Sequence, residues 1–287
     1  MPDGVDIQLV SDGDKVAEVA QWVKANNVDA VVTDSYEIDE EYQRRLNRTD
    51  AELTVILDDA RHEVDASVLV NRNIYAPELT YEWRGTEPSW CLGTECLLLR
   101  EPFRTCAAAN RPFPKTVDSV VVTVDGVDRE NRTPTAMRAL SRFDVSTSVI
   151  VGLGFETGNE IRQTAAKFGD NITVRTDPEN LPDLFFEADL AACTLGTTTY
   201  ELLATQASIV GIPDNDTPIP AALESRDAAI VLSRHPTIDE VSSTVSRVLR
   251  SPELRRTLWS VSDELIAGEG QKNVVEAIET SVSEKGG

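Results

Sequence analysis

Histidine and cysteine, the usual ligands of zinc, are scarce in this sequence. Its 287 residues include two histidines and four cysteines, and no two cysteines have the CxxC spacing of zinc motifs. The spacing therefore predicts no metal site. We expect Cys91, Cys96, Cys106 and Cys193 to be buried free thiols in a reducing compartment.

Long apolar runs are also missing, and none approaches the roughly 18 residues that cross a bilayer. The N-terminus, Met-Pro-Asp-Gly-Val-Asp, has neither the basic stretch nor the apolar stretch of a secretory signal. These two absences predict a soluble, cytoplasmic protein that makes no use of a membrane.

Basic residues are outnumbered by acidic ones, 27 to 49, and the formal net charge is −22. Such a charge repels phosphates and argues against nucleic-acid binding. The acids could form a patch for a basic partner, or a solvated shell adapted to high salt. Because they are spread along the whole chain, we favour the halophilic shell, whose self-repulsion salt would screen.

The apolar residues that are present form a pattern of alternating strands and helices. Short apolar runs predict strands, and apolar residues three or four apart predict helices. In the first half, strands are predicted at residues 6–10, 28–33, 53–57 and 66–70, and helices at 15–26 and 38–46. This βαβ alternation indicates a doubly wound parallel sheet.

A segment without periodicity, residues 104–116, contains two prolines and is predicted to link two domains. The alternation restarts at residues 119–124 and leads to a helical tail at 238–282. We therefore expect an α/β fold with two Rossmann-like domains, residues 1–110 and 116–287. This plan resembles the glycosyltransferase B architecture, which holds its ligand between the halves.

A turn rich in glycine and threonine, residues 195–201, follows a predicted strand and precedes a helix. Free backbone N–H groups at such a turn bind anions, Gly196 would let a phosphate approach the main chain, and Thr197 and Thr198 add hydroxyl donors. Glu201 could accept from ribose hydroxyls. An ordinary helix start with a threonine cap explains the turn equally well, and it matches neither GxGxxG nor the Walker A loop.

A second loop, Asp125-Gly126-Val127-Asp128, follows the first strand of the same domain. Open α/β sheets bind ligands at the carboxyl ends of their strands. A plain turn is an equally good interpretation of this loop alone. Both loops are predicted at one edge, however, so each strengthens the other, and we include Gly126 among the ligand-binding residues.

Polar residues also follow two strands of the first domain. Tyr36 comes soon after the strand at 28–33, where its hydroxyl would reach a ligand site, and Asp58 and Asp59 follow the next strand. The two acids are also typical of helix or turn capping. Tyr36 is also typical of an amphipathic residue half-buried at a sheet edge.

Six short segments occur in a diagnostic order along most of the chain. They are DSYEID (34–39), LDD (57–59), Asn71, LGTECLLLREPF (92–103), ADLAACTLGTTTYELL (188–203) and AGEGQKNVVEAI (267–278). As an ordered set they resemble the UDP-2,4-diacetamido-2,4,6-trideoxy-β-L-altropyranose hydrolases of pseudaminic-acid biosynthesis.

This resemblance implies hydrolysis of the sugar–UDP bond at the anomeric carbon, without metal or cofactor, releasing UDP and a free 2,4-diacetamido sugar. It implies that the pyrophosphate binds Gly196, Thr197 and Thr198, with Glu201 near the ribose. Gly126 would belong to the same nucleotide site.

The resemblance also assigns two catalytic residues. Tyr36 matches an active-site tyrosine of that family, and Asn215 matches an asparagine at the sugar. The glutamine that usually follows the asparagine is Asp216 here, and the family's tight glycine pair is reduced to Asp125-Gly126.

The family opens with a strand and a GxGHxxR-type loop whose histidine is its expected catalytic base. This sequence starts beyond that point, so we expect an N-terminally truncated first domain. His62 and His235 lie in polar stretches and are predicted to be surface residues. Two alternatives stay open, a glycosyltransferase of the same architecture and a UDP-sugar-binding protein without catalysis. The oligomeric state is not indicated.

Overall fold

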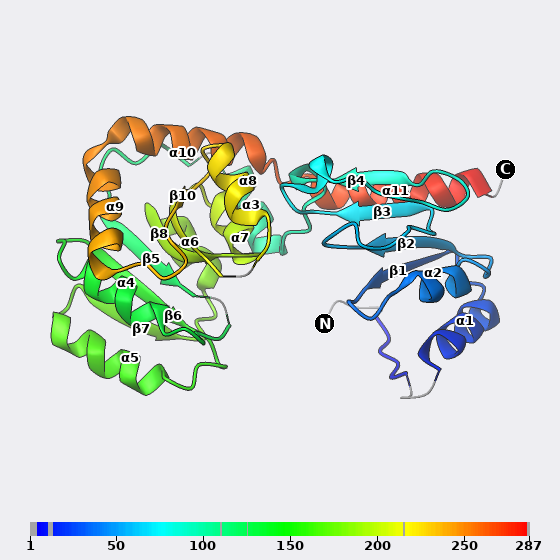
Figure 1. The fold of residues 1–287 in the computed structure, drawn as a ribbon, viewed down its shortest axis with the longest axis horizontal. Coiled ribbons are helices and arrows are strands. Elements are labelled where there is room, and N and C mark those ends of the chain that lie inside the picture. The colour runs from blue at the N-terminus through cyan, green and yellow to red at the C-terminus, as the bar shows by residue number, and fades with distance from the viewer. Residues whose placement is uncertain (1–4, 11–13, 110, 125, 215, 286–287) are drawn as a thin grey trace. The chain divides into compact units, whose positions relative to one another are not determined.

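The computed structural model describes residues 5–10, 14–109, 111–124, 126–214 and 216–285. By their contacts, residues 1–96 and 270–287 form one compact unit, unit 1, and residues 97–269 form another, unit 2. Each unit is built on a parallel sheet covered by helices, as the alternating pattern predicts (Figure 1).

Unit 1 contains a four-stranded sheet in the order β1-β2-β3-β4. Its strands are β1 (Ala30–Asp34), β2 (Glu52–Ile56), β3 (Val68–Asn71) and β4 (Ser89–Leu92), and its helices are α1 (Lys15–Asn26), α2 (Glu40–Leu46), α11 (Gly270–Lys285) and the short η1 (Ala76–Glu78) and η2 (Thr94–Cys96). Leu53, Val55 and Leu69 of the central strands pack with Val16 of α1 and Leu46 of α2. This shared core fixes where β1, β2 and β3 end.

One prediction for this unit is wrong, and one strand was not predicted. Residues 6–10 form no strand, and Leu9 is 87% exposed, because the apolar alternation there has no neighbouring strand to pair with. The strand β4 went unpredicted because Ser89–Leu92 is a four-residue run with one serine, too short to show a period.

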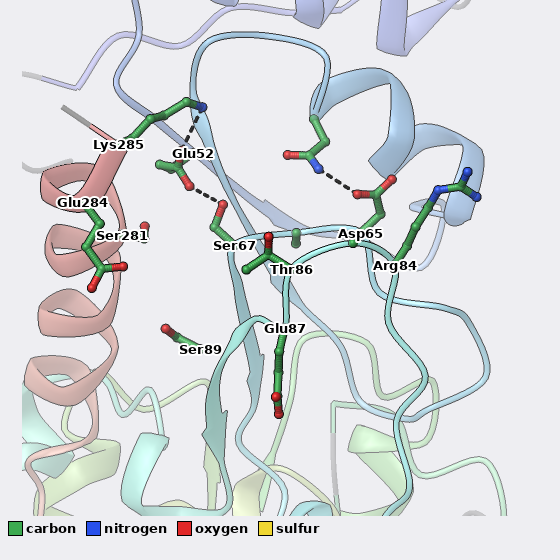
Figure 2. Close-up of a pocket in the computed structure, with 13 residues that line it drawn as sticks. Glu52, Asp65, Ser67, Arg84, Thr86, Glu87, Ser89, Ser281, Glu284 and Lys285 are labelled. Atoms are coloured by element: carbon green, nitrogen blue, oxygen red, sulfur yellow. Dashed lines mark hydrogen bonds and ion pairs between the residues drawn. The ribbon is translucent and has the colours of Figure 1, made fainter. Parts of the chain in front are cut away.

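Helix α11 packs against β2, β3 and β4 of unit 1, whereas the predicted boundaries grouped it with the second half. An ion pair joins Lys285 Nζ to Glu52 Oε1 over 2.8 Å, and the hydroxyl of Ser67 donates to the other oxygen of Glu52 (Figure 2). Asn273 Nδ2 donates to the carbonyl oxygen of Glu95 at 2.7 Å. These contacts involve single polar residues, which a search for periodicity does not detect.

Unit 2 contains a six-stranded parallel sheet in the order β10-β9-β8-β5-β6-β7. The strands are β5 (Ser119–Thr123), β6 (Ser146–Val151), β7 (Ile172–Thr176), β8 (Leu190–Leu195), β9 (Ser208–Pro213) and β10 (Ile230–Val231). The helices are α3 (Glu101–Ala108), α4 (Arg132–Leu140), α5 (Gly158–Ala165), α6 (Leu181–Glu187), α7 (Thr198–Ala204), α8 (Ile219–Ser225), α9 (Ile238–Arg250), α10 (Pro252–Leu265) and the short η3 (Ala166–Phe168).

The chain builds this sheet outward from β5 in two directions. It runs from β5 to β6 and β7, then returns to place β8, β9 and β10 on the other side of β5. Right-handed crossovers in opposite directions put their helices on opposite faces of the sheet. The order therefore reverses between β5 and β8, and the carboxyl ends of these two strands flank the switch point at which such folds bind ligands.

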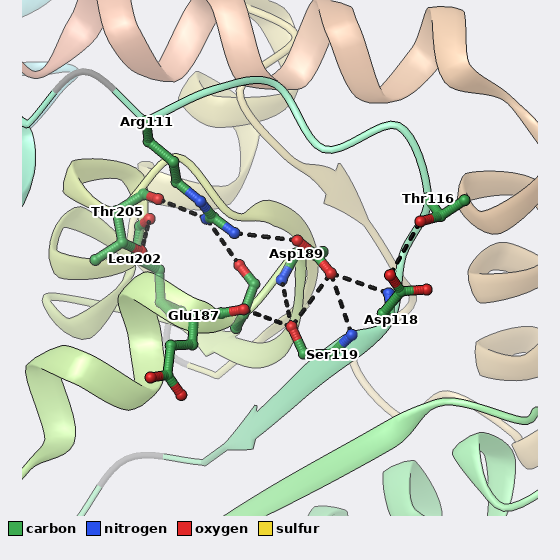
Figure 3. A network of polar contacts seen from close by, with 9 residues as sticks. Arg111, Thr116, Asp118, Ser119, Glu187, Asp189, Leu202 and Thr205 are labelled. Atoms are coloured by element: carbon green, nitrogen blue, oxygen red, sulfur yellow. Dashed lines mark hydrogen bonds and ion pairs between the residues drawn. The ribbon is translucent and has the colours of Figure 1, made fainter.

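The segment predicted as a linker is anchored to unit 2. Its first five residues belong to α3, and the buried guanidinium of Arg111 donates to the carbonyl oxygens of Ala188 and Thr205, both at 2.9 Å (Figure 3). Arg111 also donates to Asp189 at 3.1 Å, and the second oxygen of Asp189 accepts from the N–H of Ser119. One buried arginine thus fastens a stretch that has no periodic pattern.

No helix in the described ranges combines the length and the apolar composition that crossing a bilayer requires. Cys91, Cys96 and Cys193 are buried free thiols, as predicted, and Cys106 is half-buried.

Candidate functional site

In unit 1, the carboxylate of Asp58 collects polar groups at the carboxyl ends of the strands. The hydroxyl of Tyr36, two residues beyond β1, donates to Asp58 Oδ2 at 2.8 Å. Asn73, two residues beyond β3, donates from Nδ2 to Asp58 Oδ1 at 3.1 Å. Both carboxylate oxygens are engaged, so the side chain of Asp58 is held in one orientation.

Buried amides and phenols form a framework behind Asp58. Asn71, the last residue of β3, accepts from Asn73 at 3.1 Å and donates to the hydroxyl of Tyr81 at 3.0 Å. The hydroxyl of Tyr75 donates to the carbonyl oxygen of Asp58 at 2.7 Å. Burial raises the pKa of Tyr75 and that of Tyr81 to about 12, so both phenols stay neutral donors at physiological pH.

Tyr36 presents its side chain to solvent at the end of β1, with 86% of its surface exposed. The hydrogen bond to Asp58, together with the charge of that carboxylate, raises the pKa of the phenol above its ordinary value. Tyr36 is therefore protonated at neutral pH, and its single O–H is donated to Asp58, which leaves the lone pairs of the phenol oxygen for a ligand. Its predicted position at the edge of the sheet agrees with this geometry, and its catalytic role stays a prediction.

A pocket of about 150 Å³, here called the Tyr36 pocket, opens beside these groups. It is lined by Asp34, Ser35, Tyr36, Ile38, Ile56, Leu57, Asp58, Asp59, Arg61, His62 and Arg72. His62, predicted to be a surface residue, is half-buried and lines this pocket. Its neighbours in sequence, Arg61 and Glu63, are polar, so nothing in the sequence indicated that the ring lines a pocket.

The two acids after β2 have different surroundings. Asp59 accepts from the backbone N–H of Arg61 at 3.1 Å and forms an ion pair with Arg61 Nε over 2.7 Å. Asp59 therefore caps a turn, as one of the two interpretations proposed. Asp58 instead lies within the Tyr36 pocket with both oxygens aimed at other side chains.

In unit 2, the turn after β8 leaves two threonines available to a ligand. The N–H of Gly196 is not free, because it donates to the hydroxyl of Thr199 at 3.1 Å. Thr199, and not Thr197, thus satisfies the start of α7. Across the described ranges, neither the N–H nor the hydroxyl of Thr197 or Thr198 has a protein partner.

Glu201 is already bound by an arginine. Arg100 donates from Nε and Nη2 to the two oxygens of Glu201, at 2.8 and 3.0 Å. A carboxylate has about four lone-pair positions, so Glu201 retains acceptor capacity for a further hydroxyl. The predicted ribose contact would therefore be made by a carboxylate whose orientation Arg100 fixes.

The loop that holds Gly126 depends on two glycines that were not predicted. A Cβ atom on Gly152 or on Gly154 would lie 2.9 Å from the carbonyl oxygen of Gly126, too close for a side chain. A Cβ on Gly126 itself would meet nothing within 4 Å. The sequence signal was the Gly-Leu-Gly that follows β6, which lets the Gly126 loop lie against the main chain at the end of β6.

A cavity of about 470 Å³, here called the β5–β9 pocket, lies beside Gly126. It is lined by Val124, Gly126, Val127, Asp128, Arg129, Glu130, Arg132, Asp214 and Arg234. Arg132 is 5% exposed and pairs with Asp214 and, over 2.9 Å, with Glu130. Three of the nine lining residues are arginines, a high proportion for a chain with so few basic residues. Asp125 and the predicted catalytic Asn215 lie outside the described residues.

The largest of the described cavities, about 600 Å³, lies at the opposite, amino ends of β2, β3 and β4 (Figure 2). Its polar and charged groups bind one another. Lys285 pairs with Glu52, and Asn47, which follows α2, donates to Asp65 at 2.6 Å. Among the described residues, no three His, Cys, Asp or Glu side chains are grouped so that they could hold a metal ion.

Comparisons with known proteins relate the chain to others by structure. No family model and no curated protein sequence matches it. MurG of Acinetobacter baumannii is similar in structure, with a TM-score of 0.67 at 15% identity, over 96% of this chain and 83% of MurG. The spinosyn forosaminyltransferase SpnP gives a TM-score of 0.67 at 14% identity, over 94% of this chain and 80% of its own.

A third similar structure is a putative UDP-N-acetylglucosamine 2-epimerase from Listeria monocytogenes. Its TM-score is 0.63 at 10% identity, over 96% of this chain and 83% of the epimerase. Similarities at such low identity establish the fold alone. They confirm the predicted α/β class, a glycosyltransferase B-like fold built from two Rossmann-like units.

Proposed function

We propose that this chain binds a UDP-sugar and hydrolyses the bond between the sugar and UDP. The observation that carries the proposal is the switch point of unit 2, where the loops after β5 and β8 bring Gly126, Thr197 and Thr198 to one edge of the sheet. Unpartnered N–H and hydroxyl donors at that edge suit a diphosphate. One protein of similar fold is named for a UDP-sugar substrate, UDP-N-acetylglucosamine.

The roles of the residues follow from their chemistry. Thr197 and Thr198 would donate to phosphate oxygens, Gly126 would leave room for a phosphate beside the main chain, and Glu201 would accept from ribose. The groups of unit 1 suit reaction at the sugar, because Asp58 orients the neutral phenol of Tyr36, whose oxygen can accept from a sugar hydroxyl. Asn215 is proposed at the sugar on the resemblance alone.

Hydrolysis in place of transfer rests on the ordered landmarks that resemble the pseudaminic-acid hydrolases. A glycosyltransferase is the second candidate, and the forosaminyltransferase of similar fold favours it. The two differ in their need for an acceptor. A hydrolase releases free sugar from the UDP-sugar in buffer alone, whereas a transferase releases little until an acceptor is added.

Binding is tested by calorimetry of the full chain with UDP and, separately, with ADP in molar KCl. The proposal predicts heat with UDP and a markedly weaker response with ADP. Heat with ADP but none with UDP would reject the uridine assignment. No heat with either would reject the nucleotide site itself.

A further inference from the structure

The two histidines of the chain have different surroundings. The side chain of His235 is 74% exposed, and its Nδ1 lies 3.2 Å from Glu130 Oε2. His62 is half-buried and lines the Tyr36 pocket together with Tyr36 and Asp58. Over the described ranges, no protein group forms a hydrogen bond or an ion pair with the His62 ring. Both ring nitrogens are therefore available to water in the pocket.

Hydrolysis needs a group that removes a proton from water. Most other titratable groups of this pocket are already paired with protein groups or are protonated. Asp58 has both oxygens engaged, and Asp59 is paired with Arg61. The pKa of Tyr36 is raised, so the phenol is protonated and cannot take up the proton of a water molecule. The guanidinium groups of Arg61 and Arg72 stay protonated as well.

This leaves Asp34, at the end of β1, and His62. A general base is most effective when its pKa lies near the working pH. Asp34 is exposed to bulk solvent, whereas the ring of His62 is half-buried within the pocket. Histidine is also the side chain that most often serves as a general base, so position and chemistry favour His62.

The size of the pocket agrees with a role in handling water. Its volume of about 150 Å³ fits a few water molecules, each occupying roughly 30 Å³ in the liquid. A 2,4-diacetamido sugar is larger than this. The space beside His62 and Asp58 therefore suits an attacking water better than it suits a whole sugar.

We propose that His62 is the general base of this chain, an inference that rests on the proposed hydrolysis of a UDP-sugar. The imidazole takes a proton from a water molecule, and the water oxygen forms a bond to the anomeric carbon. The bond from that carbon to the phosphate oxygen breaks, and UDP leaves with its electron pair. The imidazolium then returns its proton to solvent, which restores the base.

The test compares His62→Ala with the matched control His235→Ala in the full chain. UDP release from UDP-2,4-diacetamido-2,4,6-trideoxy-β-L-altropyranose is measured from pH 5 to pH 9 in molar KCl. We expect kcat/KM to fall by about 10²–10⁴-fold in His62→Ala and to stay within about twofold in His235→Ala. The wild-type loss of activity toward low pH should disappear with His62.

Adding free imidazole distinguishes a general base from a structural residue, because only the loss of a base can be rescued in this way. It should restore part of the activity of His62→Ala, because the truncated side chain leaves room for a free base, and should not affect the wild type. His62→Gln, which keeps polarity and similar volume, is measured beside it. Melting temperatures and UDP affinities of both variants should match the wild type.

Three results would overturn the inference. Wild-type activity in His62→Ala does so and leaves the hydrolase proposal standing. A loss with an unchanged pH profile and no rescue by imidazole assigns His62 a structural role. A wild-type chain that binds UDP but releases no sugar at any pH rejects the hydrolysis and its base together, while the nucleotide site survives.

Discussion

The carboxyl edges of the two sheets are built from different materials. In unit 1 the edge consists of side chains that hold one another, with Asp58 fixed by Tyr36 and Asn73. In unit 2 it consists of small-residue loops, where Gly126 lies against Gly152 and where Thr197 and Thr198 keep their donors unpartnered. Oriented side chains suit proton transfer, and open main chain suits an anion. The contrast suggests that chemistry and nucleotide binding can be damaged separately.

After the replacement of His62, the largest effect is expected at Tyr36. Tyr36→Phe removes one hydroxyl from an exposed ring, so the fold should survive while turnover falls by about 10²-fold, the order of magnitude expected for one hydrogen-bonding group lost at a reacting centre. UDP affinity should not change. The measurement pairs initial rates of UDP release with calorimetry.

Tyr42→Phe is the control for this change, because Tyr42 packs beside the core of unit 1, away from the pocket. Equal losses in the two variants would point to a general effect on unit 1. Full activity in Tyr36→Phe would remove the tyrosine from the mechanism.

A smaller effect is expected at Gly126, and it should appear in UDP affinity, which the change at Tyr36 should leave unaltered. A Cβ there meets no protein atom, so Gly126→Ala should keep the melting temperature, yet it should obstruct a phosphate and weaken UDP binding by about tenfold. Gly158→Ala, whose Cβ makes only an ordinary 3.4 Å contact with Val151, is the control and should bind UDP normally. Unchanged UDP affinity in Gly126→Ala would move the phosphate away from this loop.

Variants of Glu201 and Arg100 distinguish a direct contact between Glu201 and UDP from an effect of the ion pair between the two residues. If Glu201 accepts from the ribose, Glu201→Gln should weaken UDP binding several-fold, because a charged acceptor makes the stronger hydrogen bond. Arg100→Ala, which removes the partner of Glu201 and a contact with the Phe103 ring but leaves the carboxylate charged, should change it less. Identical losses of UDP affinity, measured by calorimetry, would mean that UDP binding depends on the intact ion pair and would contradict a separate ribose contact by Glu201.

The mildest expected effect concerns salt. With a net charge of −22, dilute buffer leaves the self-repulsion of the chain unscreened. The thermal unfolding midpoint should therefore be lower in dilute buffer than in molar KCl. A midpoint that is unchanged or raised when salt is removed contradicts the halophilic interpretation and favours an acidic patch for a basic partner.

Periodicity predicted most of the fold, because buried parallel strands such as β2, β3 and β8 are continuous apolar runs. It wrongly predicted a strand at residues 6–10, where the apolar alternation is present but no neighbouring strand pairs with it. It could not place α11 or the segment around Arg111, since each is fastened by a few polar contacts that leave no period in the sequence.

The candidate site was predicted in outline. Strand ends located Tyr36, Asp58 and the turn at Gly196, because the carboxyl ends of parallel strands meet at one edge. The half-burial of His62 and the pairing of Glu201 with Arg100 were missed. Both arise from contacts between elements distant in sequence, which local spacing does not encode.

The central claim is that water attacks the anomeric carbon of a UDP-sugar. The most direct test incubates the chain with UDP-2,4-diacetamido-2,4,6-trideoxy-β-L-altropyranose in ¹⁸O-labelled water, without an acceptor, and determines the mass of the UDP. Label in the sugar is not informative, since a free sugar exchanges its anomeric oxygen with water. The account predicts release of UDP that carries no ¹⁸O. Labelled UDP would show attack at phosphorus, and no release of UDP until an acceptor is added would show a transferase.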